Sequence, residues 1–139
     1  YCPGGKQGVV DEMVQNIDYA PTFLEAADVK VPSDIQGRSL LPLLQGKKPA
    51  DWRKSLYYHY YEYPAEHSVC RHYGIRTKRY TLIHFYNDID SWELYDLKKD
   101  PSQLHNIYGE KGTEKLTESL KKELKELQVQ YNDPIRNQY

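Results

Sequence analysis

The chain has 139 residues, and its 19 Lys and Arg against 20 Asp and Glu give a formal net charge of -1. This length fits one domain, or one small domain with a lead-in segment, and is too short for a large hydrolase. The balanced charge excludes a global field that would attract nucleic acid or an anionic membrane, so we expect neither as a partner. There is no apolar run of about 18 residues, and the first residues, YCPGG, lack an initiator Met and the apolar core of a signal peptide. We therefore expect a fragment of a longer protein.

Residues 18–27 predict a short amphipathic helix. Asp18 is a suitable N-cap, and Pro21 falls in the first turn, where its missing N–H costs nothing. Apolar residues recur at helical spacing, and we expect this face to pack on a neighbour: Ala20, Phe23, Leu24 and Ala27.

A second, apolar helix is predicted at residues 40–44 (LLPLL), capped by Ser39 and ended by Gly46. Its composition predicts that it is buried. The polar residues 45–51 (QGKKPAD) are typical of a linker or a surface crossing.

Residues 52–97 have the composition of strands. In residues 55–63, Leu56, Tyr58 and Tyr60 alternate with Tyr57, His59 and Tyr61. Residues 74–77 and 80–85 read as a hairpin, and residues 92–97 as another strand. Because the connections are short, we expect an antiparallel sheet. The 14 Tyr against 2 Phe fit such a sheet, with cross-strand aromatic pairs favoured over a sugar-binding surface.

The last element is a helix that Thr113 can cap and that residues 132–134 (NDP) end. One narrow apolar stripe predicts that this helix lies on the sheet: Leu116, Leu120, Leu124, Leu127 and Tyr131. Before it, residues 98–101 (KKDP) predict a turn.

Few residues suggest chemistry. The chain has no phosphate-binding loop, nucleophile elbow, HExxH or CxxC. Its 2 Cys allow one disulfide, Cys2–Cys70, or none. The cluster of residues 67–72 (HSVCRH) offers three soft ligands for zinc, yet it lacks a fourth. His and Arg on a loop can also bind a sulfated sugar, and a solvent-exposed loop remains equally open on these residues alone.

The other histidines and aspartates are predicted to be structural. His59, His84 and His105 lie singly in strand or turn patterns. Calcium is a weaker reading of the acidic residues than turn and cap roles, because they lack the remaining oxygen ligands and the Gly of an EF-hand loop: Asp88, Asp90, Asp96 and Asp100.

Several ordered motifs together resemble the C-terminal part of the sulfatase family, within the alkaline phosphatase superfamily and especially its bacterial polysaccharide-degrading members. They are residues 8–14 (GVVDEMV), 16–24 (NIDYAPTFL), 36–46 (QGRSLLPLLQG), 74–83 (GIRTKRYTLI), 93–101 (ELYDLKKDP) and Asn106. Three positions depart from the family pattern: Thr81 stands for the usual Lys, Gln103 for Glu, and Cys70 for a residue other than Cys.

The resemblance implies a parent enzyme that hydrolyses sulfate esters, with sulfated carbohydrates as substrates and a periplasmic or secreted location. Such enzymes use a formylglycine made from Cys or Ser in a Cys/Ser-x-Pro-x-Arg motif, assisted by a divalent cation, usually Ca²⁺, that Asp and Asn hold. Neither Cys2 nor Cys70 fits that motif. We therefore expect no catalytic residue, metal or cofactor in this fragment, which alone would be inactive.

The resemblance also implies a domain organisation. Residues 1–50 would be the end of the main α/β domain with a linker, contributing short helices at its edge. Residues 51–139 would be an α+β subdomain, a small antiparallel sheet of about four strands packed by a C-terminal helix. The main domain of the same parent chain is then a partner. The loop of residues 64–73 would line the substrate pocket, with His72 first, then Arg71 and His67.

Two alternatives stay open. A stand-alone α+β module could bind carbohydrate or peptide on its Tyr-rich sheet, or the parent could be a related phosphonate or phosphate ester hydrolase. The fragment interpretation predicts a bare apolar patch on residues 40–44 and on the face of Phe23 and Leu24.

Overall fold

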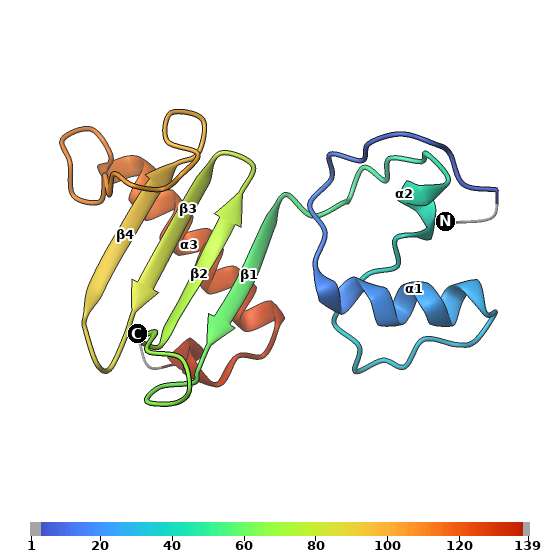
Figure 1. The fold of residues 1–139 in the computed structure, drawn as a ribbon, viewed down its shortest axis with the longest axis horizontal. Coiled ribbons are helices and arrows are strands. Elements are labelled where there is room, and N and C mark those ends of the chain that lie inside the picture. The colour runs from blue at the N-terminus through green and yellow to red at the C-terminus, as the bar shows by residue number, and fades with distance from the viewer. Residues whose placement is uncertain (1–3, 138–139) are drawn as a thin grey trace. The chain divides into compact units, whose positions relative to one another are not determined.

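The computed structural model of the chain describes residues 4–137, which divide into two compact units, residues 4–54 and 55–137 (Figure 1). Within the described residues, no helix has the length and apolar character needed to cross a bilayer.

Short helices make up the regular structure of the first unit. A 3-10 turn, η1 (Asn16–Asp18), runs directly into helix α1 (Tyr19–Ala26), and α2 (Leu41–Leu44) follows. Pro21 lies in the first turn of α1, where the sequence predicted it, and is buried. Ser39 accepts a hydrogen bond from the Leu41 backbone N–H at 3.2 Å, but the N-cap residue of the second helix is Leu40, without a side-chain cap, and not Ser39 as predicted.

Asp18 does not cap α1 with its side chain, contrary to the sequence prediction. Its fully buried carboxylate instead accepts two hydrogen bonds from the Arg53 guanidinium, each 2.7 Å long. The backbone N–H groups of Gln15 and Arg38 donate further bonds of 2.8 Å. Burial alone would raise the pKa of Asp18, but the bonds from Arg53, Arg38 and Gln15 outweigh it and hold the pKa below its usual range.

The two apolar helices are less buried than predicted. In α1 the buried residues are Pro21 and Thr22, while Phe23 is 70% exposed. In α2 only Leu43 is buried, and its helical neighbours are half-buried, so the expected burial of this helix is wrong for most of its residues. Apolar helical residues with this much accessible surface are unusual on a protein surface that contacts only solvent.

The second unit is a four-stranded antiparallel sheet in the order β1-β2-β3-β4. Its strands are β1 (Ser55–Tyr60), β2 (His72–Thr77), β3 (Tyr80–Phe85) and β4 (Ser91–Asp96). The predicted hairpin and the antiparallel pairing are confirmed. Tyr57 pairs with Ile75, and Ile75 with Leu82, so these three side chains share one face of the sheet.

Helix α3 (Glu114–Gln130) crosses that face, and a 3-10 turn, η2 (Pro134–Asn137), follows it (Figure 1). Leu120 and Leu124 of the predicted stripe are buried, and the other three stripe residues pack against the same core. Thr113 stands at the N-cap position, but its hydroxyl donates to the Glu110 carbonyl instead of capping the helix. The antiparallel sheet with α3 packed on one face confirms the α+β class predicted from sequence.

Candidate functional site

His72 is the first residue of β2, so it lies on a strand and not in the loop that the sequence predicted to extend to residue 73. Its ring stacks on Tyr60 at a centroid distance of 5.4 Å and contacts Phe85 at 5.2 Å. Tyr58 meets the ring edge-on at 5.9 Å. These side chains belong to the sheet face opposite α3, because they alternate with the residues of the core.

Arg71 closes the loop between β1 and β2. Its guanidinium donates to the backbone carbonyls of Tyr61, at 3.1 Å, and of Tyr63, and it forms an ion pair with Asp88 at 3.3 Å. The backbone carbonyl of Arg71 accepts from the Tyr86 N–H. The structure thus gives Arg71 a structural use, and a role in substrate binding stays a prediction.

His67 lies on the exposed part of the same loop. Cys70 is half-buried and forms no disulfide with a described residue. Cys2 lies outside the described residues, so its pairing with Cys70 does too. The structure therefore brings His72 and Arg71 to neighbouring positions at the start of β2. His67 stands apart from them in the loop.

A buried hydrogen-bond network under the sheet was not foreseen from the sequence. Asp133 accepts from His59 Nδ1 at 2.7 Å and from the Tyr57 hydroxyl at 2.8 Å, while His59 Nε2 lies 2.6 Å from the Tyr86 hydroxyl. Burial would raise the pKa of Asp133, but these bonds and the Ile135 N–H hold it below its usual range. In the sequence Asp133 precedes a proline and signals only a helix stop, so no local pattern could have found it.

His84 has a similar structural role, as predicted. Its Nδ1 lies 2.7 Å from the Tyr73 hydroxyl, and its Nε2 lies 2.8 Å from Asp90. Its ring stacks on Trp92 at 4.1 Å. His105 is exposed and pairs with Glu110.

The aspartates that invited a calcium reading have protein partners. Asp88 pairs with Arg71, Asp90 with His84, and Asp96 with Arg79, and the Asp100 carboxylate accepts the backbone N–H of His105. Across residues 4–137, no three His, Cys, Asp or Glu side chains gather as metal ligands would. The residues that are described do not fit a calcium site or the zinc site considered for residues 67–72.

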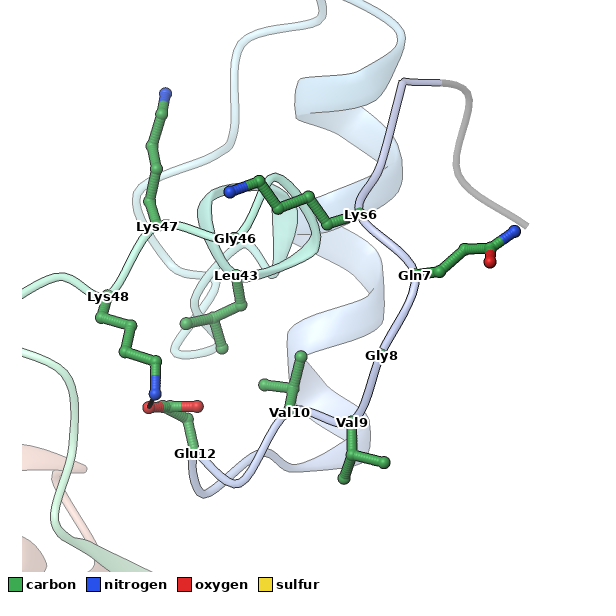
Figure 2. Close-up of a pocket in the computed structure, with 10 residues that line it drawn as sticks. All are labelled: Lys6, Gln7, Gly8, Val9, Val10, Glu12, Leu43, Gly46, Lys47 and Lys48. Atoms are coloured by element: carbon green, nitrogen blue, oxygen red, sulfur yellow. Dashed lines mark ion pairs between the residues drawn. The ribbon is translucent and has the colours of Figure 1, made fainter.

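A small cavity of about 170 Å³ lies in the first unit, lined by Leu43, three lysines and neighbouring residues of the 6–12 segment (Figure 2). Lys48 pairs with Glu12 at 3.6 Å. Figure 2 shows the Lys47 side chain pointing away from Lys48. The ammonium groups therefore do not converge on one point, as an anion site requires.

Comparison with known proteins gives the family context of this fold. A family model described as "N-sulphoglucosamine sulphohydrolase, C-terminal" matches residues 2–130. The N-acetylglucosamine-6-O-sulfatase of Bacteroides thetaiotaomicron is 62% identical over 120 residues, which cover 85% of this chain and 22% of that protein.

Two solved structures extend the comparison. A protein solved in complex with its substrate, D-glucosamine-2-N,6-O-disulfate, has a TM-score of 0.81 at 61% identity, over 84% of this chain and 24% of its own. The phosphonate monoester hydrolase from Silicibacter pomeroyi has a TM-score of 0.82 at 25% identity, over 99% of this chain and 29% of its own. The chain thus spans about a quarter of the length of each of these three proteins. Because the family model covers nearly the whole chain, the chain belongs to the N-sulphoglucosamine sulphohydrolase C-terminal family, which confirms the predicted resemblance to the C-terminal part of sulfatases.

Proposed function

We propose that this chain is the C-terminal part of a sulfatase that hydrolyses sulfate esters of sulfated carbohydrates, with glucosamine sulfates as the first class to test. The observation that carries the proposal is the 62% identity to an N-acetylglucosamine-6-O-sulfatase. The similarity to a protein solved with a disulfated glucosamine as its substrate supports the same class. The family resemblance also leads us to propose a periplasmic or secreted parent protein.

The chemistry that breaks the sulfate ester is assigned to the upstream part of the parent. Sulfatases use Ca²⁺ and formylglycine, and the described residues offer no calcium ligand set. Cys2 is followed by Pro-Gly-Gly-Lys and Cys70 by Arg-His-Tyr-Gly, so neither lies in the formylglycine motif. This chain would instead contribute and position side chains that line the substrate pocket.

Residues 1–50 would belong to the main domain. Support comes from apolar side chains of the first unit that remain exposed, with Phe23 70% and Tyr19 57% accessible. Their rings stack at a centroid distance of 6.5 Å, which forms a flat apolar surface suited to a neighbouring layer. The main domain in the same parent chain is the proposed neighbour.

The direct test is hydrolysis by the full-length parent protein. It should release sulfate from N-acetylglucosamine 6-sulfate and from D-glucosamine-2-N,6-O-disulfate. It should leave a phosphonate monoester largely intact. Preferred cleavage of the phosphonate would favour the second candidate, a phosphonate ester hydrolase, which the structural similarity at 25% identity keeps in view.

His72 is the pocket residue to test first. Replacing it by Ala in the full-length protein should raise KM for the sulfated sugar or lower kcat/KM by roughly 10-fold, the value of one lost hydrogen bond. Unchanged kinetics on the true substrate would remove His72 from the pocket.

A further inference from the structure

The start of helix α1 is bound to the segment that precedes α2. The Thr22 hydroxyl donates to the Asp18 carbonyl oxygen at 2.5 Å and accepts the Leu40 backbone N–H at 2.8 Å. The backbone N–H of Arg38 donates to the buried Asp18 carboxylate at 2.8 Å. Because Asp18 and Thr22 are four residues apart, both lie on one side of the helix, and that side is fixed to the segment before α2.

A close backbone approach and a buried ion pair complete this arrangement. Gly37 lies so near the Ile17 backbone that a Cβ at position 37 would be 1.9 Å from the Ile17 carbonyl oxygen, so the approach requires glycine. The Arg53 guanidinium forms two hydrogen bonds of 2.7 Å to the Asp18 carboxylate. We term these contacts the α1 interlock; it comprises Ile17, Asp18, Thr22, Gly37, Leu40, Arg53 and the backbone of Arg38.

A different side of α1 is apolar and open. Tyr19 and Phe23 are also four residues apart, their rings stack at a centroid distance of 6.5 Å, and they are 57% and 70% exposed. The buried residues of α1 are Pro21 and Thr22. The rotation of α1 about its axis is therefore set by the side that carries Asp18 and Thr22, and turning the helix would turn the ring stack with it.

We infer, on the basis of the proposed function, that the α1 interlock fixes the rotation of α1 and so presents the stacked rings of Tyr19 and Phe23 as a preformed docking surface for the upstream main domain of the same parent chain. This chain spans about a quarter of the length of the relatives compared above, so most of a parent of that length lies outside it. A surface held in its bound form before docking loses less conformational entropy on association.

Arg53 and Arg38 form a matched pair of arginines. Their guanidinium groups lie over the Trp52 ring, at 5.5 and 4.7 Å from its centroid, and each forms two hydrogen bonds to one carboxylate. Arg53 binds the fully buried Asp18, whereas Arg38 binds Asp51, whose side chain is 78% exposed. Replacement by lysine keeps the charge at either position but loses the paired hydrogen bonds, and only the Arg53 side chain belongs to the α1 interlock.

Hydrogen–deuterium exchange of the full-length parent measures how firmly α1 is held. Arg53→Lys should raise the exchange of the α1 amides roughly 10- to 100-fold, because a hydrogen bond to a buried charged group is lost. Arg38→Lys should change the same amides by less than about threefold, since its carboxylate partner is exposed. The amides of β1–β4 should exchange as in the wild type in both variants. Equal effects of the two substitutions on α1, or no effect of Arg53→Lys, would overturn the inference.

Thr22→Val is the second variant, for the case that Arg53→Lys does not fold. It removes the hydroxyl that bonds Asp18 and Leu40 while keeping the shape of the side chain, and it should raise α1 exchange roughly 3- to 10-fold. Thr113→Val is its control, because the Thr113 hydroxyl bonds the Glu110 carbonyl in the second unit. Unchanged α1 exchange in Thr22→Val would also overturn the inference.

Hydroxyl-radical labelling of the same full-length proteins reports on the docking surface. Tyr19 and Phe23 should be protected in the wild type and in Arg38→Lys, and labelled more strongly in Arg53→Lys. Leu104, which is 87% exposed in the second unit, is the reference that should be labelled equally in all three. Strong labelling of Tyr19 and Phe23 in a wild-type parent that hydrolyses a sulfated glucosamine would overturn the inference. A parent that releases no sulfate contradicts the proposed function instead, so the two failures are distinguishable.

Discussion

The Asp133 carboxylate links the segment that follows α3 to strand β1 through hydrogen bonds to its individual oxygens. One carboxylate oxygen meets both His59 and Tyr57, and the other accepts the Ile135 N–H at 2.8 Å. The carboxylate is buried, so each of these bonds replaces water that it cannot reach. Asp18 has a similar role in the first unit, where Arg53 is the main partner of its buried carboxylate.

Replacing Asp133 by Asn should destabilise the protein by about 2 kcal/mol at pH 7, because charge-assisted bonds to buried donors are lost. The folded-state pKa of Asp133 is lowered from 3.8, so its contribution is complete above that unfolded value and is lost as the pH falls through the folded one. The difference in unfolding free energy between wild type and variant should therefore shrink below about pH 4. Urea unfolding followed across this range measures it.

Glu118→Gln is the matched control, since Glu118 is exposed on α3. It should leave the free energy of unfolding unchanged within about 0.5 kcal/mol. A stability difference between wild type and Asp133→Asn that stayed constant down to low pH would contradict the assigned role of the carboxylate.

Among the elements, α3 gives the second unit its core. Leu120 and Leu124 face Tyr57, Ile75 and Leu82 on the sheet. A four-stranded antiparallel sheet with one covered face needs such a helix, because its apolar residues would otherwise lie in water. On the opposite face, burial raises the pKa of Tyr58 to about 12. The second face is therefore partly covered by its own aromatic rings.

Leu124→Ala should lower the free energy of unfolding by about 2 to 5 kcal/mol, because the residue is 2% exposed and its removal leaves a cavity. Val129→Ala on the same helix is the control, since Val129 is 61% exposed, and it should cost less than about 0.5 kcal/mol. Chemical denaturation followed by circular dichroism measures both. Equal losses of stability in the two variants would contradict the assignment of Leu124 to the buried side of α3.

For the whole molecule, the two units differ in how completely they bury their own apolar side chains. The second unit has a continuous core of sheet and helix. The first unit leaves several large apolar side chains accessible, among them Val9 at 89% and Phe23 at 70%. We propose that this exposed apolar area of the first unit belongs to an interface with the main domain of the parent chain.

Phe23→Ser separates this proposal from an ordinary surface residue. In the full-length parent the change should cost about 1.5 to 3 kcal/mol, the value of burying one such side chain, while in the isolated chain it should cost little. Leu104→Ser is the control, because Leu104 is 87% exposed in the second unit. The measurement is thermal unfolding of both lengths of protein, and a neutral Phe23→Ser in the full-length parent would contradict the proposed neighbour.

Local patterns of the sequence determined the strands, their antiparallel order, the stripe of α3 and the family, because periodicity and turn residues act over a few neighbouring positions. His72 was singled out with its loop, but its strand position and its packing against Tyr60 and Phe85 were not. Only the tertiary structure decided the partners of Asp18 and Asp133, which lie 35 and 74 positions away in the chain at Arg53 and His59. Such pairs are selected by the geometry of packing and by the cost of burying an unpaired charge, and no short stretch of sequence records either.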